Sequence, residues 1–384
     1  MSTWPTTRLH DVADIVMGQS PPGDTYNEIG EGLPFFQGKA EFGEVSPTAK
    51  KWCSAPKKIA EAGDILMSVR APVGPTNLAD RRCCIGRGLA AIRAKQSVLD
   101  PVYLRFVLRH AEPRLASLGQ GSTFAAIGRA ELASTQFPLP PLSEQRRIID
   151  LLSRAEGIVR LRREAEKKAA ELIPALFLDM FGDPATNPKG WPTQRLGDLA
   201  EKMSDGPFGS NLKTSHYVDT GVRVIRLQNI GIGELIDDAK AYVSPEHFAS
   251  LPRHRCLPDD VIIGTLGDPN LRAIVLPATI PEALNKADCV QFRCRQGVVT
   301  PAFICWLMNM PSTLAMAASL VQGITLTRIS MGRLREMNVP VPPFSVQQAF
   351  ADHVETMSAI KSQQSAAKAK AKATFDALLG KAFS

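Results

Sequence analysis

Residues 143–181 constrain the fold of this chain more than any other stretch. Apolar or small residues recur there in alternating steps of four and three, the spacing of a coiled-coil seam, with Arg162 and Glu166 at two polar positions of the series. The apolar and small members are Ile148, Leu152, Ala155, Val159, Ala169, Ile173, Leu176 and Met180. A helix of this length spans roughly 58 Å at about 1.5 Å per residue. Such a seam requires a second helix to cover it.

The end of the chain supplies that helix. Residues 138–145 (PLPPLSEQ) return as residues 340–347 (PVPPFSVQ), and the offset of 202 holds without a gap to Phe181 and Phe383. The seam recurs at the same offset, as Phe350, Val354, Met357, Ala371, Phe375 and Leu378. We therefore predict two long helices that are complementary to each other.

A second repeat, at an offset of 187, indicates that the whole chain is duplicated. Residues 4–13 (WPTTRLHDVA) return as residues 191–200 (WPTQRLGDLA). The two bodies that begin with these openings, residues 4–138 and 191–340, contain 135 and 150 residues and differ in sequence. The difference of fifteen positions predicts an insertion in the middle of the second body. The repeated openings and closing helices enclose dissimilar middle segments, which suggests one fold adapted to two targets.

Each body mixes strand and helix signals. Short apolar runs at residues 64–69 and 260–263 follow turn residues, as strands do. Residues 101–110 and 301–310 each begin with the proline that is favoured at the first helical position. The predicted fold class is therefore α+β.

Composition narrows the class of protein. Of the 384 residues, 44% are hydrophobic and 22% charged, which is ordinary for a globular protein, and no apolar run approaches the roughly 18 residues of a membrane helix. The start of the chain lacks a signal-peptide pattern, and the seven cysteines form no CxxC pair, which favours a reducing cytoplasm and no metal site. A net charge of +7 suits a polyanionic partner.

Motifs of catalysis are missing. The sequence has no GxxxxGK[ST] loop, no HExxH and no GxSxG, and its six histidines have no ligand spacing. We expect no catalytic residue, no metal and no cofactor bound by this chain alone.

If the polyanionic partner is duplex DNA, the candidate DNA contacts are basic and polar residues beside turns and strand-like runs, where side chains reach a groove or a phosphate. Solvated surface and ordinary salt bridges remain the alternative for each of them. The candidates are Gln19, Ser20, Lys50, Lys51, Arg70, Arg81, Arg82, Arg87, Thr123, Ser210, Asn211, Arg226, Arg253, Arg255, Arg272 and Thr325.

Two WPxxRLxDxA openings, two Gly-x-Thr loops and two P[LV]PPxSxQ leads into long helices together resemble the specificity subunit of type I restriction-modification systems. The resemblance covers essentially the whole chain. It departs at Val346, where the first copy has Glu144.

The resemblance implies two target-recognition domains, separated by an antiparallel helix pair with approximate two-fold symmetry, that read an asymmetric bipartite double-stranded DNA target. It also implies two methyltransferase subunits and motor-nuclease subunits as partners, which bind S-adenosylmethionine, ATP and Mg. The expected divisions are domain 1 at residues 1–142, helix 1 at 143–182, a linker at 183–190, domain 2 at 191–344 and helix 2 at 345–384.

Two alternatives stay open: a stand-alone DNA-modifying enzyme and a helical scaffold that does not bind DNA. Only a DNA reader shows an affinity for DNA that falls steeply as salt rises. The bases read and the spacing of the half-sites do not follow from one sequence.

Overall fold

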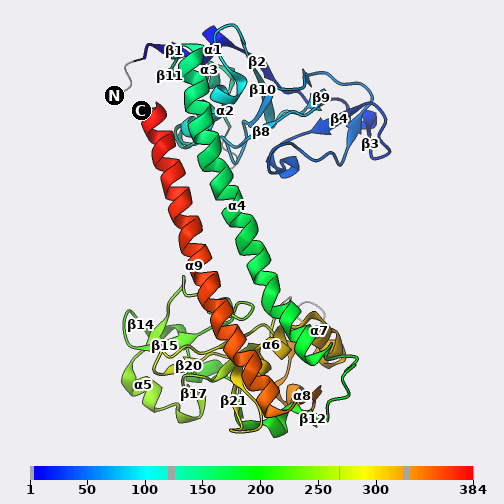
Figure 1. Ribbon diagram of the computed structural model, residues 1–384, viewed down its shortest axis with the longest axis vertical. Coiled ribbons are helices and arrows are strands. Elements are labelled where there is room, and N and C mark those ends of the chain that lie inside the picture. The colour runs from blue at the N-terminus through cyan, green and yellow to red at the C-terminus, as the bar shows by residue number, and fades with distance from the viewer. Residues whose placement is uncertain (1–3, 120–125, 268, 323–327, 384) are drawn as a thin grey trace. The chain divides into compact units, whose positions relative to one another are not determined.

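The computed structural model describes residues 4–119, 126–267, 269–322 and 328–383. Its contacts divide the chain into unit 1, residues 1–163 and 366–384, and unit 2, residues 164–365. The long helices α4 (Leu142–Phe181) and α9 (Phe344–Phe383) each contribute one end to unit 1 and the other end to unit 2 (Figure 1). The predicted α+β class, with two similar domains and two long helices, is confirmed. The finer division into domains, linker and spacers stays a prediction.

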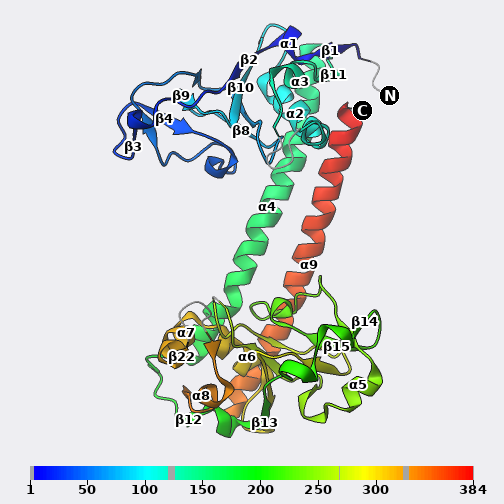
Figure 2. The ribbon, with the colours of Figure 1, turned by 180° about the vertical axis from the view of Figure 1, so that it is seen from behind.

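Unit 1 contains two main sheets. Antiparallel pairing gives the first sheet the order β2 (Ala13–Met17), β10 (Leu89–Ala94), β7 (Ile65–Ser68) and β8 (Thr76–Leu78). The second sheet has the order β3 (Tyr26–Asn27), β5 (Trp52–Cys53), β4 (Leu33–Phe36), β9 (Cys83–Ile85) and β6 (Ile59–Ala60), with β4 and β9 parallel. In Figure 2 the first sheet lies beside helix α2 (Pro101–Ser117), and β3, β4 and β9 lie farther from that helix.

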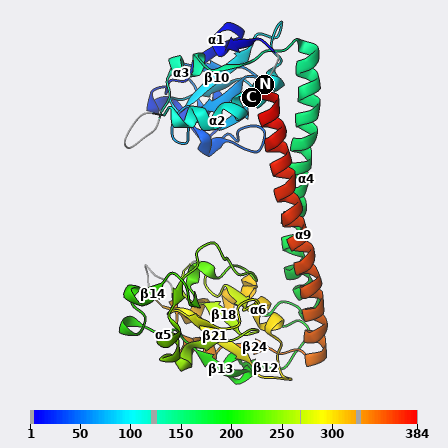
Figure 3. The same ribbon diagram turned by 90° about the vertical axis from the view of Figure 1, so that its left-hand side faces the viewer.

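Unit 2 repeats this topology. Its first sheet has the order β13 (Ala200–Ser204), β21 (Cys289–Cys294), β18 (Val261–Gly264) and β19 (Ala273–Val275). Its second sheet has the order β14 (Tyr217–Val218), β16 (Tyr242–Val243), β15 (Val222–Ile225), β20 (Ala283–Asn285) and β17 (Arg255–Cys256), with β15 and β20 parallel. Figure 3 shows β18 and β21 near helix α6 (Pro301–Asn309), and β14 and α5 (Pro245–Ala249) on the far side of the unit.

Two short antiparallel pairs close the bodies. In unit 1, β1 (Thr6–Arg8) pairs with β11 (Gln136–Pro138), and in unit 2, β12 (Thr193–Arg195) pairs with β24 (Asn338–Pro340). Each pair therefore joins the start of a repeated opening to the segment that leads into a long helix. A further pair in unit 2, β22 (Val321–Gln322) with β23 (Arg328–Ile329), borders residues 323–327.

An arginine paired with a buried aspartate repeats in the two units. Arg93 Nε lies 2.7 Å from Asp64 Oδ1, and Arg293 Nε lies 2.8 Å from Asp260 Oδ1. Both carboxylates also accept a hydrogen bond from the backbone N–H three residues earlier in the chain, at 2.8 and 2.7 Å. The duplication predicted from the sequence therefore extends to individual hydrogen bonds.

The predicted single insertion in the second body is wrong. The extra residues are spread over several connections, and a large share lies around α5. From Tyr242 to Arg255, the starts of β16 and β17, the chain advances 13 positions, against 7 from Trp52 to Ile59 in unit 1. The extra residues of the second body therefore lengthen connections such as the one between β16 and β17, and both units keep the same strand order.

The helix that follows each first sheet starts where the sequence predicts. Asp100 accepts a hydrogen bond from Val102 N at 2.8 Å, and Thr300 accepts one from Phe303 N at 3.2 Å, so both helices have a capped first turn. Helix α2 continues to Ser117, well past the predicted residue 110. In unit 2, α6 ends at Asn309, and Pro311 starts a separate helix, α7 (Pro311–Ala317).

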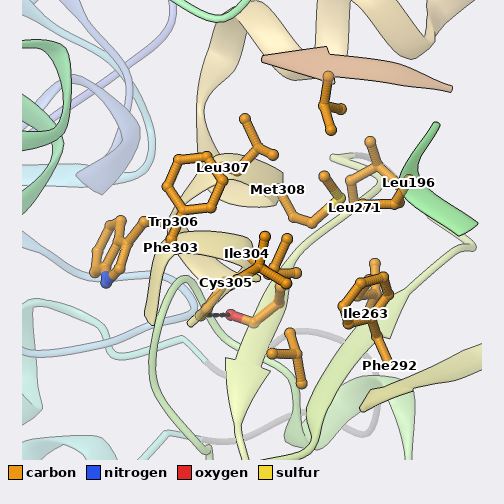
Figure 4. Close-up of a cluster of buried hydrophobic side chains, with 14 of the residues drawn as sticks. Leu196, Ile263, Leu271, Phe292, Phe303, Ile304, Cys305, Trp306, Leu307 and Met308 are labelled. Carbon is orange, nitrogen blue, oxygen red and sulfur yellow. Dashed lines mark hydrogen bonds between the residues drawn. The ribbon is translucent and has the colours of Figure 1, made fainter. Parts of the chain in front are cut away.

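The core of unit 2 joins α6, the first sheet and the long helices. Phe303, Ile304 and Leu307 lie in one buried cluster with Ile263 and Phe292 (Figure 4). In the same cluster, burial raises the pKa of the Cys305 thiol to about 12. The thiol therefore stays neutral and donates a hydrogen bond to Ala273 O at 3.3 Å.

Within unit 2 the long helices run antiparallel. The ring centroids of Phe181 and Phe350 lie 5.1 Å apart, and Ser365 Oγ donates to Glu166 Oε1 at 2.8 Å. Residue numbers therefore rise along α4 as they fall along α9. In unit 1, the start of α4 and the end of α9 share the core that contains Leu152 and Phe375.

The predicted seam positions are at least half-buried. Those in the core of unit 1, or packed against it, are Ile148, Leu152, Ala155, Val159, Phe375 and Leu378. Those of unit 2 are Ile173, Leu176, Phe350, Val354 and Met357, and Ala169 and Ala371 are half-buried. Phe375 contacts Phe106 of α2, at 6.3 Å between ring centroids, so this seam position packs on the domain as well.

Unit 1 attaches α2 to α4 by a charged clamp. Glu156 on α4 lies 2.5 Å from Arg105 Nη2 and 2.6 Å from Arg109 Nη1. The repeat places Cys305, Asn309 and Ser358 at these positions in unit 2. The clamp therefore belongs to unit 1 alone.

We expect Glu156→Ala to lower the free energy of unfolding by about 1–2 kcal/mol, because two half-buried arginines lose a shared carboxylate. Urea denaturation of the whole chain measures the change. The control is Asp150→Ala, which removes an exposed pair with Arg154 on the same helix and should cost about 0.5 kcal/mol or less. Equal losses for the two variants would contradict a stabilising role of the clamp.

Candidate nucleic-acid interface

A recess of about 700 Å³ in unit 1 gathers three of the predicted DNA-contact residues. Ser20 follows β2, Arg70 follows β7, and Arg87 lies in the turn between β9 and β10. The remaining polar side chains of the lining are Gln37, Lys39, Glu41 and Ser68. Segments far apart in the sequence thus bring polar and cationic groups to one place.

The backbone that carries Arg87 is closely held. A side chain at Gly88 would place its Cβ 2.1 Å from Gln37 O, so only glycine allows this approach of the turn to the neighbouring segment. Gly86 N donates to Phe36 O at 2.8 Å, and Val69 N donates to Gly88 O at 2.9 Å. Arg87 therefore projects from a turn that is fixed on both sides.

Arg70 is fixed in a different way. Its backbone forms an isolated antiparallel bridge with Ala126, and its carbonyl accepts a hydrogen bond from Ser68 Oγ at 3.0 Å. Both arginine side chains are exposed. Over the part of the chain that the structure describes, neither guanidinium has a hydrogen-bond or ion-pair partner.

Other predicted arginines of unit 1 are paired. Arg81 Nη2 lies 2.9 Å from Asp80 Oδ2, and its hydrogen bond lowers the pKa of Asp80. Arg82 Nε lies 3.4 Å from Glu61 Oε1. Their charge is thus partly neutralised within the protein.

The other candidates of unit 1 lie outside the recess lining. Gln19, Lys50 and Lys51 are exposed, and the backbone N–H of Gln19 donates to Ile85 O at 3.0 Å. Thr123 and its counterpart Thr325 in the second body lie outside the described residues.

The candidates of unit 2 that the structure describes come from separate segments of the chain. Ser210 and Asn211 lie in the short 3-10 helix η4 (Gly209–Asn211) and are exposed. Arg226 is half-buried, and its Nη2 donates to Ala239 O at 3.0 Å. The others lie apart: Arg253 is exposed, Arg255 pairs with Glu282 at 2.8 Å, and Arg272 is half-buried.

The counterpart of the recess in unit 2 has different chemistry. The bridge between Arg70 and Ala126 recurs as a bridge between Leu266 and Arg328, so an arginine is present on the opposite strand. Arg328 Nε lies 2.7 Å from Asp288 Oδ1, and its guanidinium stacks 5.0 Å from the ring centroid of Phe208.

Two aspartates neutralise this arginine. Asp205 Oδ2 lies 3.9 Å from Arg328 Nη2. Burial raises the pKa of Asp205, and the charge of Arg328 opposes that shift. Phe208 remains 45% exposed, so an aromatic face takes the place of the cationic surface of unit 1.

Sequence reasoning missed Gln37, Lys39 and Glu41 in unit 1, and Phe208 and Arg328 in unit 2. For the first three a signal existed: Gln37 and Gly38 directly follow the apolar run Leu33–Phe36, where a strand gives way to a turn. No local signal in the sequence indicates Arg328, because its partners come from three other segments.

Within the described ranges, no group of three or more histidine, cysteine or acidic side chains is arranged to hold a metal ion. In the same ranges, no helix has the length and apolar character needed to span a membrane.

Comparison with known proteins bears on the resemblance seen in the repeats. Residues 1–171 match the family model described as the type I restriction modification DNA specificity domain. The chain resembles the specificity subunits of type I restriction-modification systems. The prediction drawn from the repeated motifs is therefore confirmed.

Two curated specificity subunits from Methanocaldococcus jannaschii illustrate the likeness. The putative MjaX subunit is 42% identical over 43% of this chain and 39% of its own length. The MjaVIII subunit is 18% identical over 98% of this chain and 92% of its own length. The aligned part of the chain covers only 39% and 60% of the first two curated relatives.

A solved structure supports the fold of the whole chain. It comes from work on the assembly and conformational transition of the type I R-M system, and it is 21% identical with a TM-score of 0.61. It covers 99% of this chain and 97% of its own. At this identity the likeness establishes the fold and nothing more.

Proposed function

We propose that this protein is the DNA-binding specificity subunit of a type I restriction-modification complex, and that each body contacts one half of an asymmetric, bipartite DNA target. The observation that carries the proposal is one topology used twice with different side chains at matching places. Ser20, Arg70 and Arg87 surround the recess of unit 1, and Phe208 and Arg328 occupy its counterpart in unit 2. A net charge of +7 is consistent with a polyanionic partner.

In this proposal the long helices separate the two readers and dock two methyltransferase subunits. Within unit 1, α4 leaves Leu151, Ile158 and Leu161 exposed at 51%, 53% and 59%. Leu151 and Ile158 are seven positions apart and Leu161 is one turn farther on, so the three lie along one side of the helix. Such a row of exposed leucine and isoleucine suits packing against a partner helix.

The chemistry of the complex belongs to the partners in this proposal. Methyltransferase subunits supply S-adenosylmethionine, motor-nuclease subunits supply ATP and Mg, and the chain itself positions them on DNA without catalysis. The complex acts in the cytoplasm, where it meets incoming DNA.

Exchange of one body tests the proposal that each body contacts its own half of the DNA target. We expect replacement of residues 191–340 by the second body of another specificity subunit to change one half of the methylated target and leave the other unchanged. Each body has its own core and its own contacts, which is the physical reason for independence. Methylome sequencing of cells that carry the chain and its methyltransferase partner provides the measurement.

The reciprocal exchange of residues 4–138 is the matched control, and it should change only the other half. If either exchange alters both halves or neither, the proposal of one reader per half is wrong. A scaffold that does not bind DNA is distinguished by gel shift, because only a DNA reader loses affinity steeply as salt rises. A stand-alone enzyme would modify DNA without partner subunits.

A further inference from the structure

The recess of unit 1 offers both hydrogen-bond donors and acceptors. Arg70, Arg87 and Lys39 are cationic donors, and Gln37 has an amide with a donor and an acceptor end. Glu41 contributes a carboxylate, whose Oε2 already accepts from Gly38 N at 3.0 Å and from Gln37 N at 3.4 Å. Its other oxygen is not used in these bonds.

This mixture fits a base edge better than a phosphate. A phosphate presents only acceptors and negative charge, so Glu41 would repel it. The major-groove edge of a G·C pair presents acceptors on guanine and an amino donor on cytosine. An arginine fork matches guanine O6 and N7, and a carboxylate accepts from the cytosine amino group.

Arg70 and Arg87 are suited to this task because their backbones are held and because, among the described residues, their guanidinium groups have no hydrogen-bond or ion-pair partner. Arg81 and Arg82 in the same unit have carboxylate partners, and base contact would require breaking those pairs. In unit 2, Arg328 is engaged by Asp288. The free arginine forks thus distinguish the recess of unit 1 from its counterpart.

We propose that the recess of unit 1 reads a G·C pair in its half of the DNA target, with Arg70 or Arg87 on guanine and Glu41 on cytosine. The proposal rests on the function proposed above and adds the base pair read by that surface.

The test uses the chain in complex with its methyltransferase subunits and the conservative variants Arg70→Lys and Arg87→Lys. Lysine keeps the positive charge for phosphate and loses the fork for guanine. For at least one variant we expect the preference for the target over a duplex with A·T in place of the G·C pair to fall roughly 5- to 150-fold. Affinity for unrelated duplex DNA should stay within about two-fold.

The control is Arg154→Lys, an arginine of the same unit that is paired with Asp150 on α4 and lies outside the recess; its base preference should not change. The inference is overturned if the half of the target read by unit 1 contains no G·C pair. It is also overturned if both variants keep full preference or lose affinity equally for all sequences. If the unsubstituted complex showed no sequence preference, the proposed function would fall, and this inference with it.

Discussion

Phe350→Ala on α9 is expected to lower the free energy of unfolding of unit 2 by about 3–5 kcal/mol. The ring is fully buried, and its centroid lies 5.6 Å from that of Phe177 and 5.1 Å from that of Phe181. Phe303 of α6 stacks on the Phe177 ring and meets the Phe181 ring edge-on. Truncation therefore removes the side chain that joins the two long helices to the domain and leaves a cavity among rigid aromatic rings.

Hydrogen exchange measured by mass spectrometry separates the two units, because it follows peptides individually. Peptides from α6 and from residues 164–181 should lose protection, and peptides from the first sheet of unit 1 should keep it. Phe344→Ala, six residues earlier on the same helix and 39% exposed, is the control and should change little. Similar losses of protection for the two variants would show that the aromatic cluster does not hold unit 2 together.

Gln347→Ala should cost about 2–4 kcal/mol in the same unit, because it removes a side chain that satisfies three backbone groups near the start of α9. Gln347 Oε1 accepts from Thr300 N at 3.0 Å, and Nε2 donates to Val298 O at 3.2 Å and to Pro342 O at 2.8 Å. Alanine removes all three of these hydrogen bonds, two of which are buried. Urea denaturation gives the loss of stability.

The adjacent residue provides the control for this substitution. Gln348 is exposed and donates only to Asp352, so Gln348→Ala should cost about 0.5 kcal/mol or less. Gln145 makes the same three bonds in unit 1, to Asp100 N, Val98 O and Pro140 O. Gln145→Ala should therefore destabilise unit 1 by a similar amount, and a negligible effect of either variant would refute the anchoring role.

The long helices were predictable because their signals are local and repeated. The seam spacing and the offset of 202 indicate α4 and α9 almost to the residue. The role of the glutamine in the repeated lead was not predictable, because its partners at Val298 and Thr300 lie far away in the sequence. A second apolar face was also missed: Phe177 and Phe181 point toward the domain, and a search for one seam does not select them.

The site was predictable only in part. Local neighbours suggested Ser20, Arg70 and Arg87, and the fold places these three around one recess. Whether an arginine is free depends on acids that are distant in sequence, as Glu282 is from Arg255. Gln37 follows β4 and Arg87 follows β9, and the parallel pairing of these two strands brings the two residues to the same recess. The sequence contains no local signal for that pairing.

The end of α9 completes the core of the unit that contains the start of the chain. Phe375, Leu379 and Phe383 are buried there, and the Phe383 ring lies 5.3 Å from that of Tyr103, whose hydroxyl donates to Pro138 O. During synthesis on a ribosome, the N-terminal body therefore waits for residues 366–383, whereas every residue of unit 2 has been made by then. The usual order of co-translational folding, N-terminal domain first, is reversed here. A nascent chain released before Phe375 would expose apolar surface on its first domain, because the final turns of α9 cover that surface.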